Sequence, residues 1–180
     1  WHSNTVDRFA RSIKRFRRIF HEDNFFMRVA LIGRTEILYE TAGVLINNGH
    51  SIVVIITAFE APEYTKKSSD FSSLADELGI PFGSGHKIEN FKTELIEANA
   101  DIGVSMNYTG IIPQSIIDIF PNGILNAHGG DLPRYRGNAC QAWAILNGEK
   151  RIGLCIHKMI GGELDNGDII ERDYVEVSDI

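Results

Sequence analysis

The sequence predicts an α/β protein with a doubly wound, mostly parallel sheet. From residue 27 onward, short apolar runs alternate with amphipathic stretches, and this alternation is typical of strand–helix–strand units. The run Ile52 to Ile56 is apolar at every position, which suits a strand covered by helices on both faces. The 180 residues suffice for one such domain, and a 43% hydrophobic content is that of a folded globular protein.

The first predicted element is an amphipathic helix over residues 5–20. Five apolar residues recur there at helical spacing: Val6, Phe9, Ile13, Phe16 and Phe20. The opposite face is basic, and residues 1–26 carry a net charge of +3. We expect this N-terminal extension to pack on its own protein or on a second copy in a homodimer. A membrane surface or another partner is the alternative.

Strands and helices then follow in turn. Strands are predicted at 27–33, 51–57, 101–106, 123–129, 152–160 and 168–177, and the last two are expected to form a hairpin. Helices are predicted at 35–49, 69–79, 89–100, 113–120 and 138–148. Thr35 and Gly49 supply start and stop signals for the first of these helices. Pro113 begins the fourth, where its missing N–H costs nothing.

Several classes of protein are disfavoured by composition. No apolar run is long enough to span a bilayer, no signal peptide is recognisable, and Cys140 and Cys155 form no metal or disulfide pattern. We therefore expect a cytoplasmic protein without a metal. Residues 27–180 carry a net charge of −9, a poor surface for nucleic acid. Because the sequence starts at Trp1 and stops after a predicted strand, we expect the natural chain to be longer.

The residues that carry chemistry begin at the end of the fourth predicted strand and continue after it, in the stretch NAHGGDLPRYRG (126–137). Asn126 and His128 are two apart on a strand and share a face, and Gly129–Gly130 allows close approach of a ligand or loop. Asp165, in GGELDNGD (161–168), can meet them. An amide donor, an imidazole and a carboxylate suit oxyanion stabilisation and proton transfer. Each residue alone also fits an ordinary role, as core histidine, turn former or loop acid.

NAHGGDLPRYRG followed by LDNGD resembles the 10-formyltetrahydrofolate-dependent formyltransferase family, and YTGIIP (108–113) resembles its folate-side segment. The resemblance runs from Met27 to the end and implies a Rossmann-like catalytic domain over 27–180. It implies formyl transfer to an amine through a tetrahedral oxyanion. Asn126 and His128 would donate hydrogen bonds to that oxygen, while Asp165 would help to remove the amine proton and hold His128 in a useful protonation state.

The resemblance also implies binding of the co-substrate 10-formyltetrahydrofolate. Its pterin would lie against Tyr108, Ile111 and Ile112 and contact the Gly161–Gly162 loop. For the two isoleucines, plain packing is the alternative.

The expected acceptor depends on what the sequence lacks. The segment after the first strand does not resemble the phosphate loop of glycinamide ribonucleotide transformylases. The segment 58–70 is shorter and less basic than the corresponding insertion of methionyl-tRNA formyltransferases. What remains resembles the sugar N-formyltransferases, which implies a nucleotide-linked amino deoxysugar used in polysaccharide synthesis and no nucleic-acid partner.

Four residues are candidates for contact with that acceptor. Asp131 would contact a sugar hydroxyl or the amine, or instead cap a turn. Arg134 and Arg136, with Tyr135 between them, would contact the diphosphate or pair with acids such as Asp131. Methionyl-tRNA formylation is the alternative function, and a non-catalytic folate-binding domain or a formyltetrahydrofolate hydrolase is a further one. His157 is expected to be structural.

Overall fold

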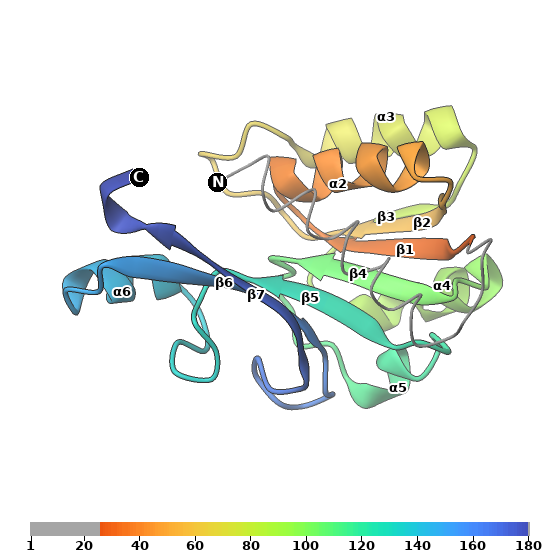
Figure 1. The fold of residues 1–180 in the computed structure, drawn as a ribbon. Coiled ribbons are helices and arrows are strands. Elements are labelled where there is room, and N and C mark those ends of the chain that lie inside the picture. Colours follow the sequence, from red (N-terminus) through yellow and green to blue (C-terminus); the bar gives the residue numbers. More distant parts are fainter. Residues whose placement is uncertain (1–25, 180) are drawn as a thin grey trace.

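The computed structural model describes residues 26–179, which form a seven-stranded sheet in the order β3-β2-β1-β4-β5-β6-β7 (Figure 1). The strands are β1 (Arg28–Gly33), β2 (Ser51–Thr57), β3 (Phe82–Ser84), β4 (Ile102–Met106), β5 (Ile124–His128), β6 (Arg151–Lys158) and β7 (Ile169–Glu176). The first five strands are parallel, and β6 is antiparallel to both of its neighbours. The predicted fold class and the C-terminal hairpin of β6 and β7 are therefore confirmed. Strand β3 was not predicted, because three residues are too short to show a period.

The helices are α2 (Glu36–Asn47), α3 (Ser68–Leu78), α4 (Lys92–Ala98), α5 (Gln114–Ile117) and α6 (Cys140–Leu146). The helix expected over 89–100 is divided into a 3-10 turn, η1 (Ile88–Phe91), and α4, which ends where Asn99 adopts a left-handed conformation. The helix expected over 113–120 is only one turn long. A second 3-10 turn, η2 (Val177–Asp179), follows β7. The helix predicted for 5–20 lies outside the described residues.

Helices cover both faces of the parallel part of the sheet. Figure 1 shows α2 and α3 on one face and α4 and α5 on the other. Each face of the sheet has its own hydrophobic core. Leu38 and Leu45 of α2 are fully buried in the first core, which lies under α2 and α3. Ile116 of α5 is fully buried in the second core, which lies under α4 and α5. Each large apolar side chain buried in this way contributes about 1.5–3 kcal/mol. Two cores explain why β1, β2 and β4 are apolar at nearly every position.

The register of the sheet lines up the carboxyl ends of the five parallel strands. One row of paired residues, the terminal row, runs across them: Ser84, Thr57, Gly33, Met106 and Ala127. The segments that leave this row carry the side chains described below. Within residues 26–179, no helix is both long and apolar enough to cross a membrane.

Candidate active site

Asn126, His128 and Asp165 meet at the carboxyl end of β5, beside the terminal row. Asn126 and His128 belong to β5, and Asp165 lies on the connection between β6 and β7. Asp165 Oδ1 is 3.5 Å from Nδ1 of His128, and both side chains are nearly buried. The structure thus brings together the three residues that the sequence singled out as the catalytic group.

His157 joins this group from the neighbouring strand. It pairs with Asn126 across the β5–β6 ladder, and its side chain is 1% exposed. Its Nδ1 is 3.0 Å from the carbonyl of Lys158, and its Nε2 is 3.2 Å from Nδ2 of Asn126. A carbonyl can only accept, so Nδ1 carries the proton and Nε2 accepts from the Asn126 amide.

This arrangement fixes the orientation of the Asn126 amide, which donates one N–H to His157 and keeps its second. Burial lowers the pKa of His157 below the ordinary histidine value, so the ring stays neutral and remains an acceptor. Asp165 Oδ1 is 3.8 Å from His157 Nε2. His157, which was expected to be structural, therefore contacts two of the three predicted catalytic side chains.

Both ring nitrogens of His128 face acceptor oxygens. Nε2 donates to the backbone carbonyl of Tyr135 at 2.6 Å, and Nδ1 faces the Asp165 carboxylate. The contact between Nδ1 and Asp165 is an ion pair when both ring nitrogens carry a proton. The close approach of the Tyr135 carbonyl requires Gly130, since a Cβ there would lie 2.5 Å from that oxygen and 2.7 Å from His128 Nε2.

Asp165 also holds the loop that follows β5. Its Oδ2 accepts the backbone N–H of Gly137 at 2.8 Å. Cys140, at the start of α6, lies 3.4 Å from His128 Nε2 and donates to the carbonyl of Gly137. Burial and the negative charge of Asp165 raise the pKa of Cys140, so it remains a thiol and packs against the imidazole.

The residues predicted to bind folate lie on two loops that touch. Gly161 packs against the backbone of Gln114, leaving no room for a side chain, and its N–H donates to Gln114 Oε1 at 2.8 Å. Gly162 is exposed, with a left-handed φ of 77°. Ile111 is 77% exposed, whereas Ile112 is only 3% exposed and is buried in the second core, as in the packing alternative.

Tyr108 is half-buried, and its hydroxyl donates to the carbonyl of Gly85 at 2.8 Å. Burial, reinforced by the negative charge of Glu89, raises its pKa to about 12. It stays a neutral donor that ties the loop after β4 to the loop after β3. Ile160 and Leu164, which were not predicted, add exposed apolar surface to the loop that holds Gly161 and Gly162.

The four residues predicted to contact the acceptor are engaged within the protein. Asp131 accepts from Tyr174 and pairs with Arg172, both on β7. Arg134 pairs with Glu149, which also accepts from the Tyr135 hydroxyl, and Arg136 donates to Asn166. Asp131, Arg134 and Tyr135 line a small cavity with residues of α6 and β6. Neither arginine pairs with Asp131 in this arrangement.

No group of three or more His, Cys, Asp or Glu side chains is placed to hold a metal ion anywhere in residues 26–179. Both cysteines are free and buried.

Comparison with known proteins places this geometry in a family. The sequence pattern of the family described as formyl transferase matches residues 27–179. The chain is 36% identical over 155 residues to a methionyl-tRNA formyltransferase of Rickettsia bellii, covering 82% of this chain and 50% of that protein. It is 34% identical over 145 residues to one of Malacoplasma penetrans, covering 79% and 45%. The chain thus spans about half the length of the curated relatives it matches.

A phosphoribosylglycinamide formyltransferase from Anaplasma phagocytophilum has a similar fold. Its TM-score is 0.68 at 24% identity, with 85% of this chain and 74% of that chain covered.

These relatives contradict the acceptor predicted from the sequence. They are methionyl-tRNA formyltransferases, so the predicted amino-sugar nucleotide acceptor and the predicted lack of a nucleic-acid partner were wrong. The error has a physical origin. A net charge summed over residues 27–180 does not report the local potential at a binding site. The comparison shows that this chain belongs to the formyl transferase family.

Proposed function

We propose that residues 27–180 form the catalytic domain of an enzyme that transfers the formyl group of 10-formyltetrahydrofolate to the amino group of methionyl-tRNA. The convergence of Asn126, His128 and Asp165 at one point carries the proposal. Two methionyl-tRNA formyltransferases are 34% and 36% identical to this chain over about four-fifths of its length, and this similarity supports the choice of acceptor.

Asn126 is the oxyanion donor. When the amine attacks, negative charge develops on the formyl oxygen, and a fixed N–H near that oxygen lowers the barrier. One N–H of the Asn126 amide is held by His157, which aims the other at the reacting group without further reorganisation. Removing one such donor costs about 10²–10³ in rate.

His128 supplies a second hydrogen bond. Its Nε2–H is donated to the Tyr135 carbonyl in the structure. A formyl oxygen is also a carbonyl acceptor, so exchange of one for the other keeps the number of hydrogen bonds to His128 unchanged. That exchange requires the loop 129–137 to shift.

Asp165 takes the proton that the amine loses. As the new bond to the amine forms, the bond between the formyl carbon and N10 of the donor breaks, and N10 takes up a proton. Asp165 Oδ1 lies 3.5 Å from Nδ1 of His128, so the two side chains form a route for that proton from the amine to N10.

The two loops that include Tyr108 and Gly161 hold the formyl donor, which supplies the activated one-carbon group. Ile111, Ile160 and Leu164 expose apolar side chains on these loops. An exposed apolar rim suits a flat heterocycle such as a pterin.

The test is formylation by the full-length protein. It is supplied with 10-formyltetrahydrofolate and either methionyl-tRNA or water alone, and formyl-methionyl-tRNA and released tetrahydrofolate are both measured. We expect product only with methionyl-tRNA, and a loss of about 10²–10³ in kcat for Asn126→Ala. Asn90→Ala, an exposed asparagine on η1, is the matched control and should retain the wild-type rate. Equal tetrahydrofolate release without methionyl-tRNA would identify a hydrolase and refute the proposal.

A further inference from the structure

A second group of side chains lies on the loops that follow β1, β2 and β3. The nearest of these strands, β1, is two strands away from β5 and His128. We define this group as the edge cluster: Arg34, Phe59, Tyr64 and His86. Arg34 follows β1, Phe59 and Tyr64 follow β2, and His86 follows β3. None of the four was assigned a function from the sequence, and none contacts the catalytic group described above.

The Arg34 guanidinium ties three strand ends together. Its Nε donates to the carbonyl of Asn107 at 3.0 Å, and its Nη1 donates to the carbonyl of Phe59 at 2.7 Å. Its Cζ lies 5.1 Å from the centre of the Tyr64 ring, which is cation–π distance. Arg34 therefore fixes the backbone from which Phe59 projects.

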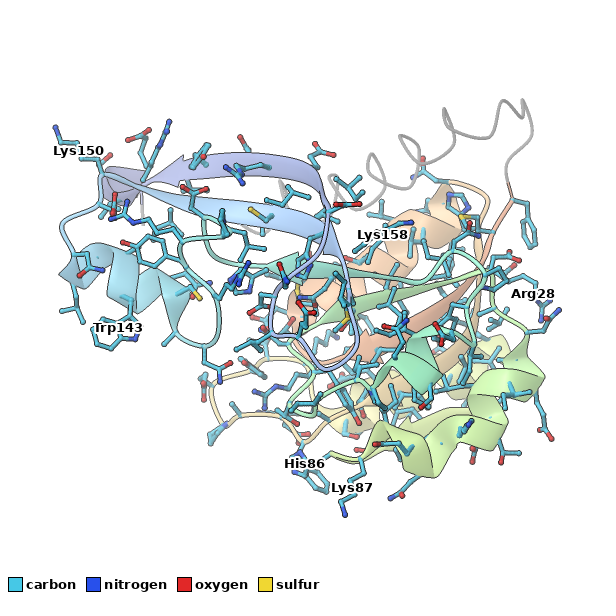
Figure 2. All side chains as sticks on the ribbon, turned by 90° about the horizontal axis from the view of Figure 1, so that it is seen from below. Arg28, His86, Lys87, Trp143, Lys150 and Lys158 are labelled. Atoms are coloured by element: carbon cyan, nitrogen blue, oxygen red, sulfur yellow. The ribbon has the colours of Figure 1, made fainter. Side chains whose placement is uncertain are left out.

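Phe59 presents an open aromatic face. Its side chain is 56% exposed, although it closely follows a strand that is almost wholly buried. Its ring packs edge-to-face on His86, with centroids 4.7 Å apart. His86 is itself anchored, since its Nδ1 lies 2.7 Å from Oγ1 of Thr109. Figure 2 shows His86 at the surface of the molecule.

A large exposed aromatic ring held by a second ring and a fixed backbone is a stacking platform. Such platforms take nucleobases, because every base has a π-face.

The distance to the catalytic group fits one nucleoside. Neighbouring strands are about 4.8 Å apart, so Arg34 lies roughly 10 Å and Phe59 roughly 14 Å along the sheet from His128. In an aminoacyl ester of a nucleoside, the ester and the ribose separate the amine from the base. With bonds of about 1.5 Å, the far side of the base lies on the order of 10–14 Å from the amine. The base of an amine held at Asn126 and His128 is therefore within reach of the edge cluster.

We propose that the edge cluster binds the terminal adenosine of the aminoacyl-tRNA, with the base stacked on Phe59, whose ring is supported edge-on by His86. This inference rests on the proposed function, because it takes methionyl-tRNA as the acceptor. It adds a specificity site for the nucleoside that bears the methionyl ester.

The test compares Phe59 variants of the full-length protein in steady-state formylation of methionyl-tRNA. We expect Phe59→Ala to raise KM for methionyl-tRNA by about 5- to 150-fold, which corresponds to about 1–3 kcal/mol at tenfold per 1.4 kcal/mol. KM for 10-formyltetrahydrofolate should stay unchanged. Phe59→Leu should behave like Phe59→Ala, and Phe59→Trp should keep the wild-type KM.

Trp143→Ala is the matched control. Trp143 is 57% exposed, like Phe59, but lies on α6, well away from His86 in Figure 2. Free adenosine should inhibit the wild type competitively against methionyl-tRNA and should inhibit Phe59→Ala much less.

Three results overturn the inference while the proposed function stands. These are an unchanged KM for methionyl-tRNA in Phe59→Ala, full rescue by Phe59→Leu, and a rise in KM for the formyl donor instead of the acceptor. Absence of any formyl-methionyl-tRNA from the wild type overturns the proposed function, and the inference falls with it.

Discussion

Exchange of His157 for asparagine or for glutamine separates its two hydrogen bonds. In His157→Asn, the new amide nitrogen can replace Nδ1 and still donate to the Lys158 carbonyl, but nothing is left to accept from Asn126. In His157→Gln, the longer side chain reaches the position of Nε2 and can accept from Asn126, but the Lys158 carbonyl loses its donor. One variant therefore releases the Asn126 amide, and the other releases the backbone.

The magnitudes follow from the bonds removed. A neutral hydrogen bond contributes about 0.5–1.5 kcal/mol, so free rotation of the Asn126 amide should lower kcat by about 2- to 12-fold in His157→Asn. A carbonyl left without its partner costs about 1–3 kcal/mol of stability in His157→Gln. In a protein of this size, that lowers Tm by roughly 2–12 °C.

The assay pairs steady-state formylation with thermal unfolding for both variants. We expect His157→Asn to lose kcat with little change in KM and only a small change in Tm. His157→Gln should show the reverse. Adding Asn126→Ala to His157→Asn should cost nothing beyond Asn126→Ala alone, because the two act through one amide. If His157→Gln loses more kcat than His157→Asn, then His157 does not position Asn126 and the reasoning is refuted.

Three further predictions follow from the site and its surroundings. Because burial lowers the pKa of His157 below the value of about 6.5 in the unfolded chain, its contribution to stability is present above about pH 6.5 and is lost as pH falls through the lower folded value. The free energy of unfolding should fall by at most about 1.4 kcal/mol for each pH unit. Urea midpoints measured at roughly pH 7.5 and 5.5 should show this fall in the wild type but not in His157→Gln. Gly130→Ala should lower kcat at least about tenfold, because the added Cβ would lie 2.7 Å from His128 Nε2 and displace that ring. Gly43→Ala, which meets open space, should keep full activity in the same assay. Asp131→Asn should leave KM for the acceptor unchanged and lower the free energy of unfolding by no more than about 1 kcal/mol, because its ion pair with Arg172 is about one-third exposed; a raised KM would show that Asp131 contacts the acceptor instead.

The fold could be predicted because its signals are local. The apolar run of β2 and the start and stop signals of α2 lie within single segments of the chain. The two-residue spacing of Asn126 and His128 was also local, and it placed both on the exit of β5. Strand β3 carries too few residues for any period to appear.

The role of His157 could not be predicted, because it depends on register. His157 reaches Asn126 only because the two are paired across antiparallel β5 and β6, and no feature of either segment sets that pairing. The partner of Asp131 is fixed in the same way: Arg172 and Tyr174 reach it from β7, more than forty residues away in sequence. Contacts made across strands require the tertiary structure.

The acceptor was misjudged for a different reason. The sequence argument used an absence, the missing basic insertion after the second strand, and a sum, the net charge of −9. Neither quantity describes the local surface formed by the loops that follow β1, β2 and β3, where we propose that the base of the acceptor binds. There the chain places a guanidinium held by two carbonyls and an exposed ring held by a second ring. A base that stacks on that ring gains contact whether the rest of the surface is acidic or basic, since stacking falls off within van der Waals range while net charge acts over about 10 Å. The edge cluster is therefore a better guide to the acceptor than the composition of the whole chain.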